Sequence, residues 1–274
     1  MRRVSILMCI LFASLLTNAM AQVVKAHPAT YSNKSLKGWY AVLGNKWLSN
    51  QDDNANASLT IADFDGAGNF TGSLTVNTAG TVTAYSGSGT YSVSKNGSGT
   101  MNTVLSGVSG SLTTAFVLDT AGKSFQFVQT ACTFCGADDT DNSTGTGIAM
   151  GASSFTNASL MGSYEVMLTK WTNAQNSQAD ASVGVMTFDG VGTVQGSFTE
   201  ASNTVQTSTF TATYSVNPDG SGSMTTTGSG DTVTLSFGIV SASSNGTGAK
   251  GLLLLKTAEP GQSNWPFSGT ATKQ

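Results

Sequence analysis

Apolar and polar residues alternate along much of this chain in short runs that are typical of β-strands. In one such run Phe70, Leu74 and Val76 share one face, and Thr71 and Thr75 share the other. A period of two with one apolar face predicts antiparallel strands that are half buried against a core. The pattern predicts eight strands in the first half, at 38–44, 57–64, 69–77, 85–93, 99–106, 112–119, 124–130 and 145–150, and a matching set in the second half.

The two halves repeat each other. The motif Ser35–Tyr40 returns as Ser159–Tyr164, about 120 positions later, and Phe64–Gly68 returns as Phe188–Gly192. Further matches keep the same order as far as the run Phe125–Thr130, which aligns with Leu252–Thr257. Ordered self-similarity of this kind indicates two copies of one domain. We predict a signal peptide at 1–21, a linker at 22–32 and domains at 33–152 and 153–274.

The turn residues favour barrels. Asp-Gly or Asn-Gly dipeptides occur at Asp65, Asn96, Asp189 and Asp219, and such pairs favour tight hairpins between neighbouring strands. A meander of eight strands removes its exposed edges when it closes on itself. The predicted fold is therefore all-β, with two tandem eight-stranded antiparallel up-and-down barrels. Two β-sandwiches are the alternative.

These motifs resemble a group of uncharacterised secreted bacterial proteins with tandem β-barrel repeats. The resemblance rests on Ser-Leu-x-Gly-x-Tyr, Phe-Asp-Gly-x-Gly and Thr-Tyr-Ser-Val, and it covers both copies. It implies a small barrel of the calycin or lipocalin kind, and it implies no activity.

The N-terminus predicts export. Arg2 and Arg3 precede the apolar run 4–16, and Ala19-Met20-Ala21 fits signal peptidase cleavage, so we expect a secreted protein, extracellular or periplasmic. Cleavage removes both arginines and makes the net charge of −3 more negative. An acidic chain without arginine is poorly suited to phosphate backbones or anionic lipids, so we expect no nucleic-acid partner and no membrane insertion. The oligomeric state is not predicted.

Catalytic residues are hard to find in the sequence. The single histidine, His27, precedes the first domain, so no histidine lies in either domain to serve as a general base. We therefore predict that the protein is not an enzyme and has no catalytic residues, no cofactor and no metal site.

Cys132 and Cys135 are the only cysteines left after cleavage. In a secreted chain they are expected to be oxidised to each other. The predicted role is a local disulfide, and the alternatives are a redox-active pair and a metal site.

A Lys-Trp pair ends the first predicted strand of each copy, Lys46-Trp47 and Lys170-Trp171. A tryptophan at a barrel mouth can stack on a sugar ring or cover an apolar ligand. The predicted function is therefore non-catalytic binding of a small molecule or glycan at the mouth. The alternative is a structural or adhesive extracellular protein, in which each tryptophan only caps its barrel.

Large residues on the apolar faces predict mostly packed interiors. They are Tyr40, Leu59, Phe70, Tyr91, Met101 and Phe116 in the first copy, and Tyr164, Val183, Phe198, Tyr214, Met224 and Phe237 in the second. An eight-stranded barrel is just wide enough to be filled by its own side chains or to hold one small ligand. We expect any ligand to stay at the mouth.

Overall fold

The computed structural model describes most of the chain from residue 30 onward. The described residues are 30–46, 56–78, 80–119, 121–135, 143–151, 154–171, 179–201, 204–227, 232–241, 250–258 and 267–274. The predicted signal peptide and nearly all of the predicted linker lie outside them.

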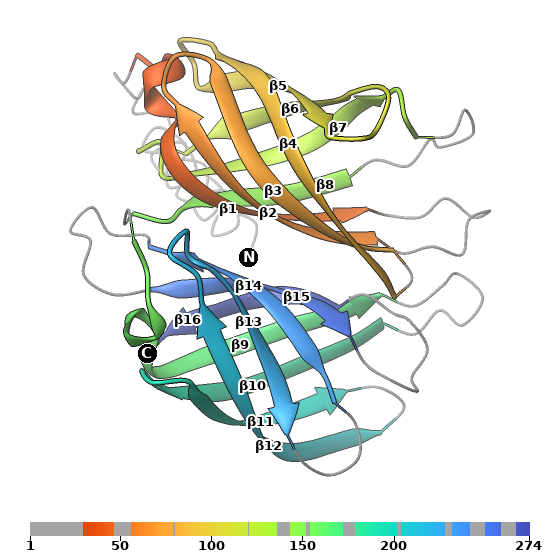
Figure 1. Cartoon of the computed structure of the whole chain (residues 1–274), viewed down its shortest axis with the longest axis vertical. Helices are drawn as coiled ribbons and strands as arrows, with labels where there is room; N and C mark the ends of the chain where they lie inside the picture. Colours follow the sequence, from red (N-terminus) through yellow and green to blue (C-terminus); the bar gives the residue numbers. More distant parts are fainter. Residues whose placement is uncertain are drawn as a thin grey trace, which may run out of the picture. The chain divides into compact units, whose positions relative to one another are not determined.

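The chain forms two closed antiparallel barrels of eight strands each, in which consecutive strands pair and the last pairs with the first (Figure 1). The first barrel contains β1 (Lys37–Lys46), β2 (Asn56–Asp65), β3 (Asn69–Thr78), β4 (Thr81–Val93), β5 (Ser98–Leu105), β6 (Leu112–Leu118), β7 (Ser124–Cys132) and β8 (Ser143–Ala149). The second contains β9 (Met161–Trp171), β10 (Ala179–Asp189), β11 (Thr193–Ala201), β12 (Val205–Val216), β13 (Ser221–Thr227), β14 (Thr234–Val240), β15 (Gly251–Ala258) and β16 (Phe267–Lys273). The predicted all-β fold with two tandem up-and-down barrels is confirmed, and the sandwich alternative is wrong.

The predicted Asp-Gly turns connect β2 to β3 and β10 to β11. The Oδ1 atom of Asp65 accepts hydrogen bonds from the backbone N–H groups of Ala67, Gly68 and Asn69 at 2.6, 2.9 and 2.9 Å. Asp189 accepts the equivalent three bonds at 2.8, 2.8 and 2.9 Å. The following glycines, Gly66 and Gly190, have φ of 76° and 79°, which only glycine adopts without strain. The aspartates thus hold the turns.

A short segment before the first strand closes the turn end of each barrel. In the first barrel this segment contains the 3₁₀ turn η1 (Asn33–Ser35) and Leu36, which is fully buried. The hydroxyl of Tyr91 donates a 2.7 Å hydrogen bond to the carbonyl of Leu36, and the hydroxyl of Tyr40 donates one of 2.6 Å to the carbonyl of Gly122.

The second barrel repeats this closure. Its segment contains η2 (Asn157–Ser159) and the fully buried Leu160, and the hydroxyl of Tyr214 donates a 3.1 Å bond to the carbonyl of Leu160. The Tyr-to-segment hydrogen bond is therefore a shared feature of both copies.

One buried apolar face lies on the outside of the first barrel, which corrects the predicted position of Leu59. Alternation from Phe64, which faces the interior, places Leu59 and Ile61 on the outward face of β2. They belong to the same buried cluster as Leu253 and Leu255 of β15. Contacts between β1 or β2 and β14 or β15 join the two barrels there.

Gly238 of β14 permits this close approach, because a Cβ atom added there would lie 2.7 Å from Cβ of Ala41. The equivalent prediction for Val183 is also wrong, since this side chain is 55% exposed on the outside of the second barrel.

Candidate functional site: a cavity inside the first barrel

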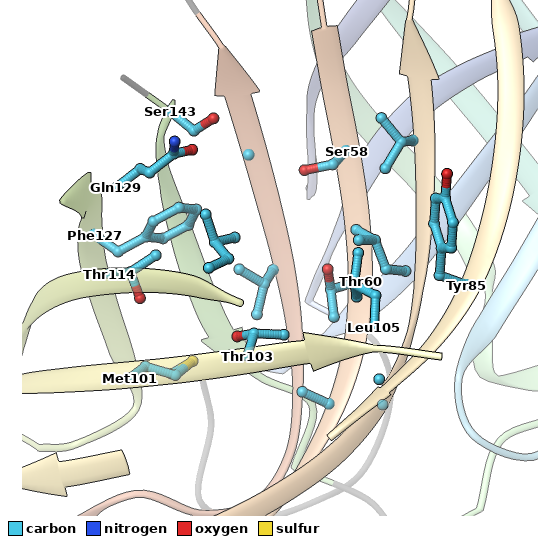
Figure 2. Close-up of a pocket in the computed structure, with 18 of the residues that line it drawn as sticks. Ser58, Thr60, Tyr85, Met101, Thr103, Leu105, Thr114, Phe127, Gln129 and Ser143 are labelled. Atoms are coloured by element: carbon cyan, nitrogen blue, oxygen red, sulfur yellow. The ribbon is translucent and has the colours of Figure 1, made fainter. Parts of the chain in front are cut away.

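A cavity of about 370 Å³ lies inside the first barrel, and all eight of its strands contribute to the lining (Figure 2). The lining includes Leu74, Gly87, Thr103, Thr114 and Phe127. Pockets of 300–1,000 Å³ are the usual size for small-molecule sites. The prediction of a mostly packed interior is therefore wrong for this part of the first barrel.

An aromatic cluster forms the floor of the cavity and fills the closed end of the barrel. The ring of Phe64 lies 5.4 Å from that of Tyr40 and 5.3 Å from that of Tyr91, both edge to face. Phe70 and Phe125 join the same cluster. Such pairs contribute roughly 0.5–1.5 kcal/mol each beyond the area they bury. The floor is therefore rigid and apolar.

Glycines opposite the phenylalanines make room for these rings. Gly89 pairs across strands with Phe70, and a Cβ on Gly89 would lie 2.5 Å from that ring. Gly99 pairs in the same way with Phe116, and a Cβ there would overlap the Phe116 ring. Gly87 is different, because the atoms nearest to a Cβ there would be the end of the Leu105 side chain at 3.2 Å and a backbone oxygen at 3.4 Å. No ring covers Gly87, so the space above it belongs to the cavity.

The second barrel fills the corresponding space. The register pairs Gly72 with Gly87 in the first barrel, whereas the equivalent pair in the second is Gly196 with Phe210. Phe210 stacks on Phe198, with ring centroids 5.2 Å apart and planes 12° from parallel. The position of Phe198 corresponds to Leu74 in the first barrel. Two facing glycines thus leave open what a stacked pair of phenylalanines occupies in the other copy.

Three further interior positions also carry a larger side chain in the second barrel than in the first. Leu235 takes the place of Thr114, Phe267 that of Ser143, and Lys256 that of Gln129, according to the strand registers. Lys256 is buried, and its Nζ atom lies 4.6 Å from the centre of the Phe267 ring. Larger side chains fill the second barrel here, so the prediction of a packed interior fits that copy.

Hydroxyl groups line the walls of the cavity, and further polar groups lie at one end. Figure 2 shows Ser58, Gln129 and Ser143 at the end opposite Met101. Asn56 also lines the cavity, and its Oδ1 atom is buried without a hydrogen-bond partner. No lysine, aspartate or glutamate is among the described lining residues. The cavity therefore offers neutral hydrogen-bonding groups along its walls and at this end, and apolar surface at its aromatic floor.

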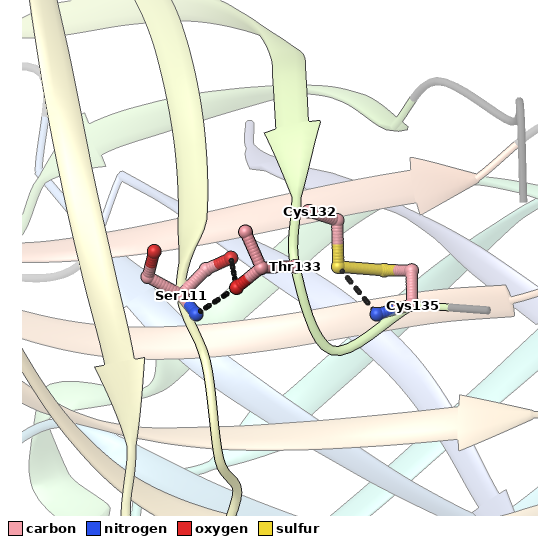
Figure 3. The surroundings of a disulfide bond; sticks show 4 residues. All are labelled: Ser111, Cys132, Thr133 and Cys135. Carbon is pink, nitrogen blue, oxygen red and sulfur yellow. Dashed lines mark hydrogen bonds between the residues drawn. A yellow bond between two sulfur atoms is a disulfide. The ribbon is translucent and has the colours of Figure 1, made fainter. Parts of the chain in front are cut away.

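The predicted cysteine pair lies at the rim. Cys132 and Cys135 form a disulfide, and Phe134 and Cys135 line the cavity (Figure 3). The Thr133 hydroxyl accepts a 2.8 Å hydrogen bond from the backbone N–H of Ser111, and the N–H of Thr133 donates one of 2.9 Å to the Ser111 carbonyl. These bonds attach the loop after β7 to the start of β6. The disulfide thus shapes one side of the cavity entrance.

The other predicted site residues are the two Lys-Trp pairs at the ends of β1 and β9. Lys46 ends β1, and Lys170 and Trp171 end β9, but the positions of their side chains are not described. Trp47 lies outside the described residues. Binding by these lysines and tryptophans stays a prediction.

The sequence alone does not identify the interior residues as a site. Leu74, Gly87 and Thr114 each fit an ordinary strand pattern. A signal existed in the repeat, since the aligned positions of the second copy carry Phe198, Phe210 and Leu235. Larger residues at these three inward positions of the second copy mark the first copy as the hollow one.

The described residues contain neither a metal-binding cluster nor a membrane-spanning helix. That part of the chain contains no group of three or more His, Cys, Asp and Glu side chains able to hold a metal ion. None of its helices has the length and apolar character required to cross a membrane.

Comparisons with known proteins assign the chain to no family. No family model and no curated protein matches the sequence. Among solved structures, a protein of unknown function from the DUF3598 family of Nostoc punctiforme is 10% identical, with a TM-score of 0.31, covering 88% of this chain and 97% of that one. Intact Ap-TbpB, with its N and C lobes, is 9% identical, with a TM-score of 0.26, covering 87% and 77%. Similarity this low supports no conclusion about what this chain does.

Proposed function

We propose that this protein is a non-catalytic binding protein, and that its ligand is a small molecule held inside the first barrel. The second barrel acts as a filled structural partner. The observation that supports this proposal best is the difference between the copies, in which Gly72 faces Gly87 in one and Gly196 faces Phe210 in the other.

The cost of an empty space supports the same proposal. A cavity in a protein core is destabilising, because its lining atoms lose contacts that a filled core would give them. The second copy demonstrates that this fold accommodates rings at these positions. An unfilled interior in one copy is therefore better explained by a ligand than by a constraint of the fold.

The test is a variant that fills the cavity with the residue of the other copy. In Gly87→Phe the new ring would lie over Gly72, as that of Phe210 lies over Gly196. The readout is titration with N-phenyl-1-naphthylamine, a neutral apolar fluorophore, followed by its emission. The unaltered protein is expected to bind the fluorophore, and Gly87→Phe is expected to weaken binding at least tenfold, which is about 1.4 kcal/mol.

Two further variants test whether a loss of binding in Gly87→Phe comes from the filled cavity and not from misfolding. Ser143→Phe adds a second ring from the other copy, at the entrance, and is expected to weaken binding in the same way. Phe210→Gly opens the second barrel and is expected to add a second binding site. Equal fluorophore affinity in the unaltered protein, Gly87→Phe and Ser143→Phe would show that the cavity is not the site.

The cellular location belongs to the proposal as well. The basic Arg2-Arg3 pair, the apolar run and Ala19-Met20-Ala21 support export, which would place the cavity in an extracellular or periplasmic setting. The alternative function, a structural or adhesive protein without a ligand, is supported by the filled second barrel alone. The hollow first barrel favours binding.

A further inference from the structure

We infer that the ligand is an uncharged amphiphile, whose apolar part contacts the aromatic floor and whose polar head donates a hydrogen bond at the Asn56 end of the cavity. This inference rests on the proposed function and narrows it to one chemical class. Three features of the cavity support it: the apolar floor, the absence of charge among the described lining residues, and an acceptor without a donor.

The floor selects the apolar part of the ligand. Phe64, Phe70 and Phe125 line the cavity there together with Ala62 and Met101. None of these side chains offers a strong hydrogen-bonding group, so a polar ligand group would lose its water there without compensation. An alkyl or aryl segment fits this end.

The described walls offer a charged ligand no counterion. The described lining contains no lysine, aspartate or glutamate, so neither a carboxylate nor an ammonium group would find an opposite charge there. Moving an unpaired charge out of water into such a site is strongly unfavourable. Ligands of the same length should therefore rank by the charge of the head group, with the neutral one binding most tightly.

The polar end of the cavity favours a ligand head group that can donate a hydrogen bond. The Oδ1 atom of Asn56 is buried and has no partner, and a buried acceptor without a donor is costly. Gln129, which is 7% exposed, and Ser143 lie at the same end and can accept or donate. A hydroxyl group can donate to Asn56 and accept from a neighbour at the same time. A neutral alcohol satisfies all of these groups.

The test compares four ligands of matched size by displacement of N-phenyl-1-naphthylamine at neutral pH. They are 1-octanol, heptyl methyl ether, octanoate and octylammonium. 1-Octanol is expected to bind at least tenfold more tightly than either ion. The ether can accept but not donate, and it is expected to bind several-fold more weakly than the alcohol.

Variants of the chain assign the head-group site. Asn56→Leu removes the acceptor and should reduce the affinity for 1-octanol to that for the ether, with little change for the ether itself. Asn102→Leu is the matched control, because Asn102 is exposed on the outside of β5 and should leave all four affinities unchanged.

The outcomes separate this inference from the proposed function. If octanoate or octylammonium binds as tightly as 1-octanol, or if Asn56→Leu leaves the preference for the alcohol intact, the ligand class is wrong. Should that binding still be lost in Gly87→Phe, the cavity remains the binding site. A third outcome is that none of the four ligands displaces the fluorophore, although Gly87→Phe abolishes fluorophore binding. In that case the proposed ligand class is wrong and the proposed function stands.

Discussion

At the scale of single residues, Asp65 and Asp189 make the stability of the protein depend on pH in the acid range. Hydrogen bonds to the carboxylates lower the pKa of each to about 2, with the largest contribution from the backbone N–H of Asn69 for Asp65 and of Gly192 for Asp189. A carboxyl with a depressed folded-state pKa stabilises the protein above its unfolded pKa of 3.8. That stability is lost as the pH falls through about 2.

The prediction is a fall in the urea midpoint between about pH 4 and pH 2, measured by circular dichroism. Asp65→Asn and Asp189→Asn should each flatten this fall, and the double variant should flatten it most. If the urea midpoint of the double variant falls between about pH 4 and pH 2 as steeply as that of the unaltered protein, the role assigned to these aspartates is contradicted.

The buried tyrosines limit the stability of the protein at high pH. Burial, the largest cause, raises the pKa of Tyr40, Tyr164 and Tyr214 to about 12. A raised folded-state pKa means that the neutral phenol is favoured in the folded protein, so its contribution is complete below the unfolded pKa of 10 and is lost as the pH rises through about 12. Alkaline loss of structure should therefore begin above pH 10 and accompany tyrosinate absorbance.

Some residues could be assigned from the sequence and others could not. The Asp-Gly turns were predictable, because a local pattern determines a local structure. Leu59 could not be placed, because β2 carries apolar residues on both faces and its outward face is covered by residues about 200 positions away. The cavity could not be predicted from the sequence, because an inward glycine has the same local sequence pattern whether a ring covers it or not.

At the scale of elements, β4 contains two inward glycines with different surroundings. Gly89 lies beneath the ring of Phe70, whereas Gly87 faces the cavity. We predict that Gly89→Ala destabilises the protein by roughly 1–3 kcal/mol, because the new methyl group would overlap both the backbone oxygen of Asn102 and the ring of Phe70. Gly87→Ala should change the free energy of unfolding by no more than a few tenths of a kcal/mol. Urea denaturation of both variants measures the difference, and equal costs would show that the space above Gly87 is not open.

The strand β15 shows how burial changes a sequence pattern. Its run of four leucines, Leu252–Leu255, is fully buried, with Leu252 and Leu254 facing the barrel interior and Leu253 and Leu255 facing the other barrel. Continuous apolar runs are expected where both faces of a strand are covered. The equivalent strand β7 alternates instead, and its outward Val128 is 39% exposed. The two copies diverged here because only one of these strands lies in the interface.

At the scale of the whole molecule, contacts between the barrels should contribute to stability. Leu255→Ala removes a fully buried side chain from the shared cluster and should cost about 2–5 kcal/mol. Val128→Ala, at the equivalent outward position of the first barrel, should change stability by about 0.5 kcal/mol or less. Chemical denaturation with a probe of each barrel checks both values. If the two costs are alike, the barrels do not stabilise each other through this face.

The filled second barrel has a consequence for how this protein can change over generations. Duplication produced two copies, and the tyrosine-bonded closure at the end of each has stayed the same while the opposite half diverged. Because the closure and the cavity occupy different levels of the barrel, substitutions at Leu74, Gly87 and Thr114 can reshape the cavity without disturbing the closure. The same division makes this fold a scaffold on which cavities of new shape can be selected in the laboratory.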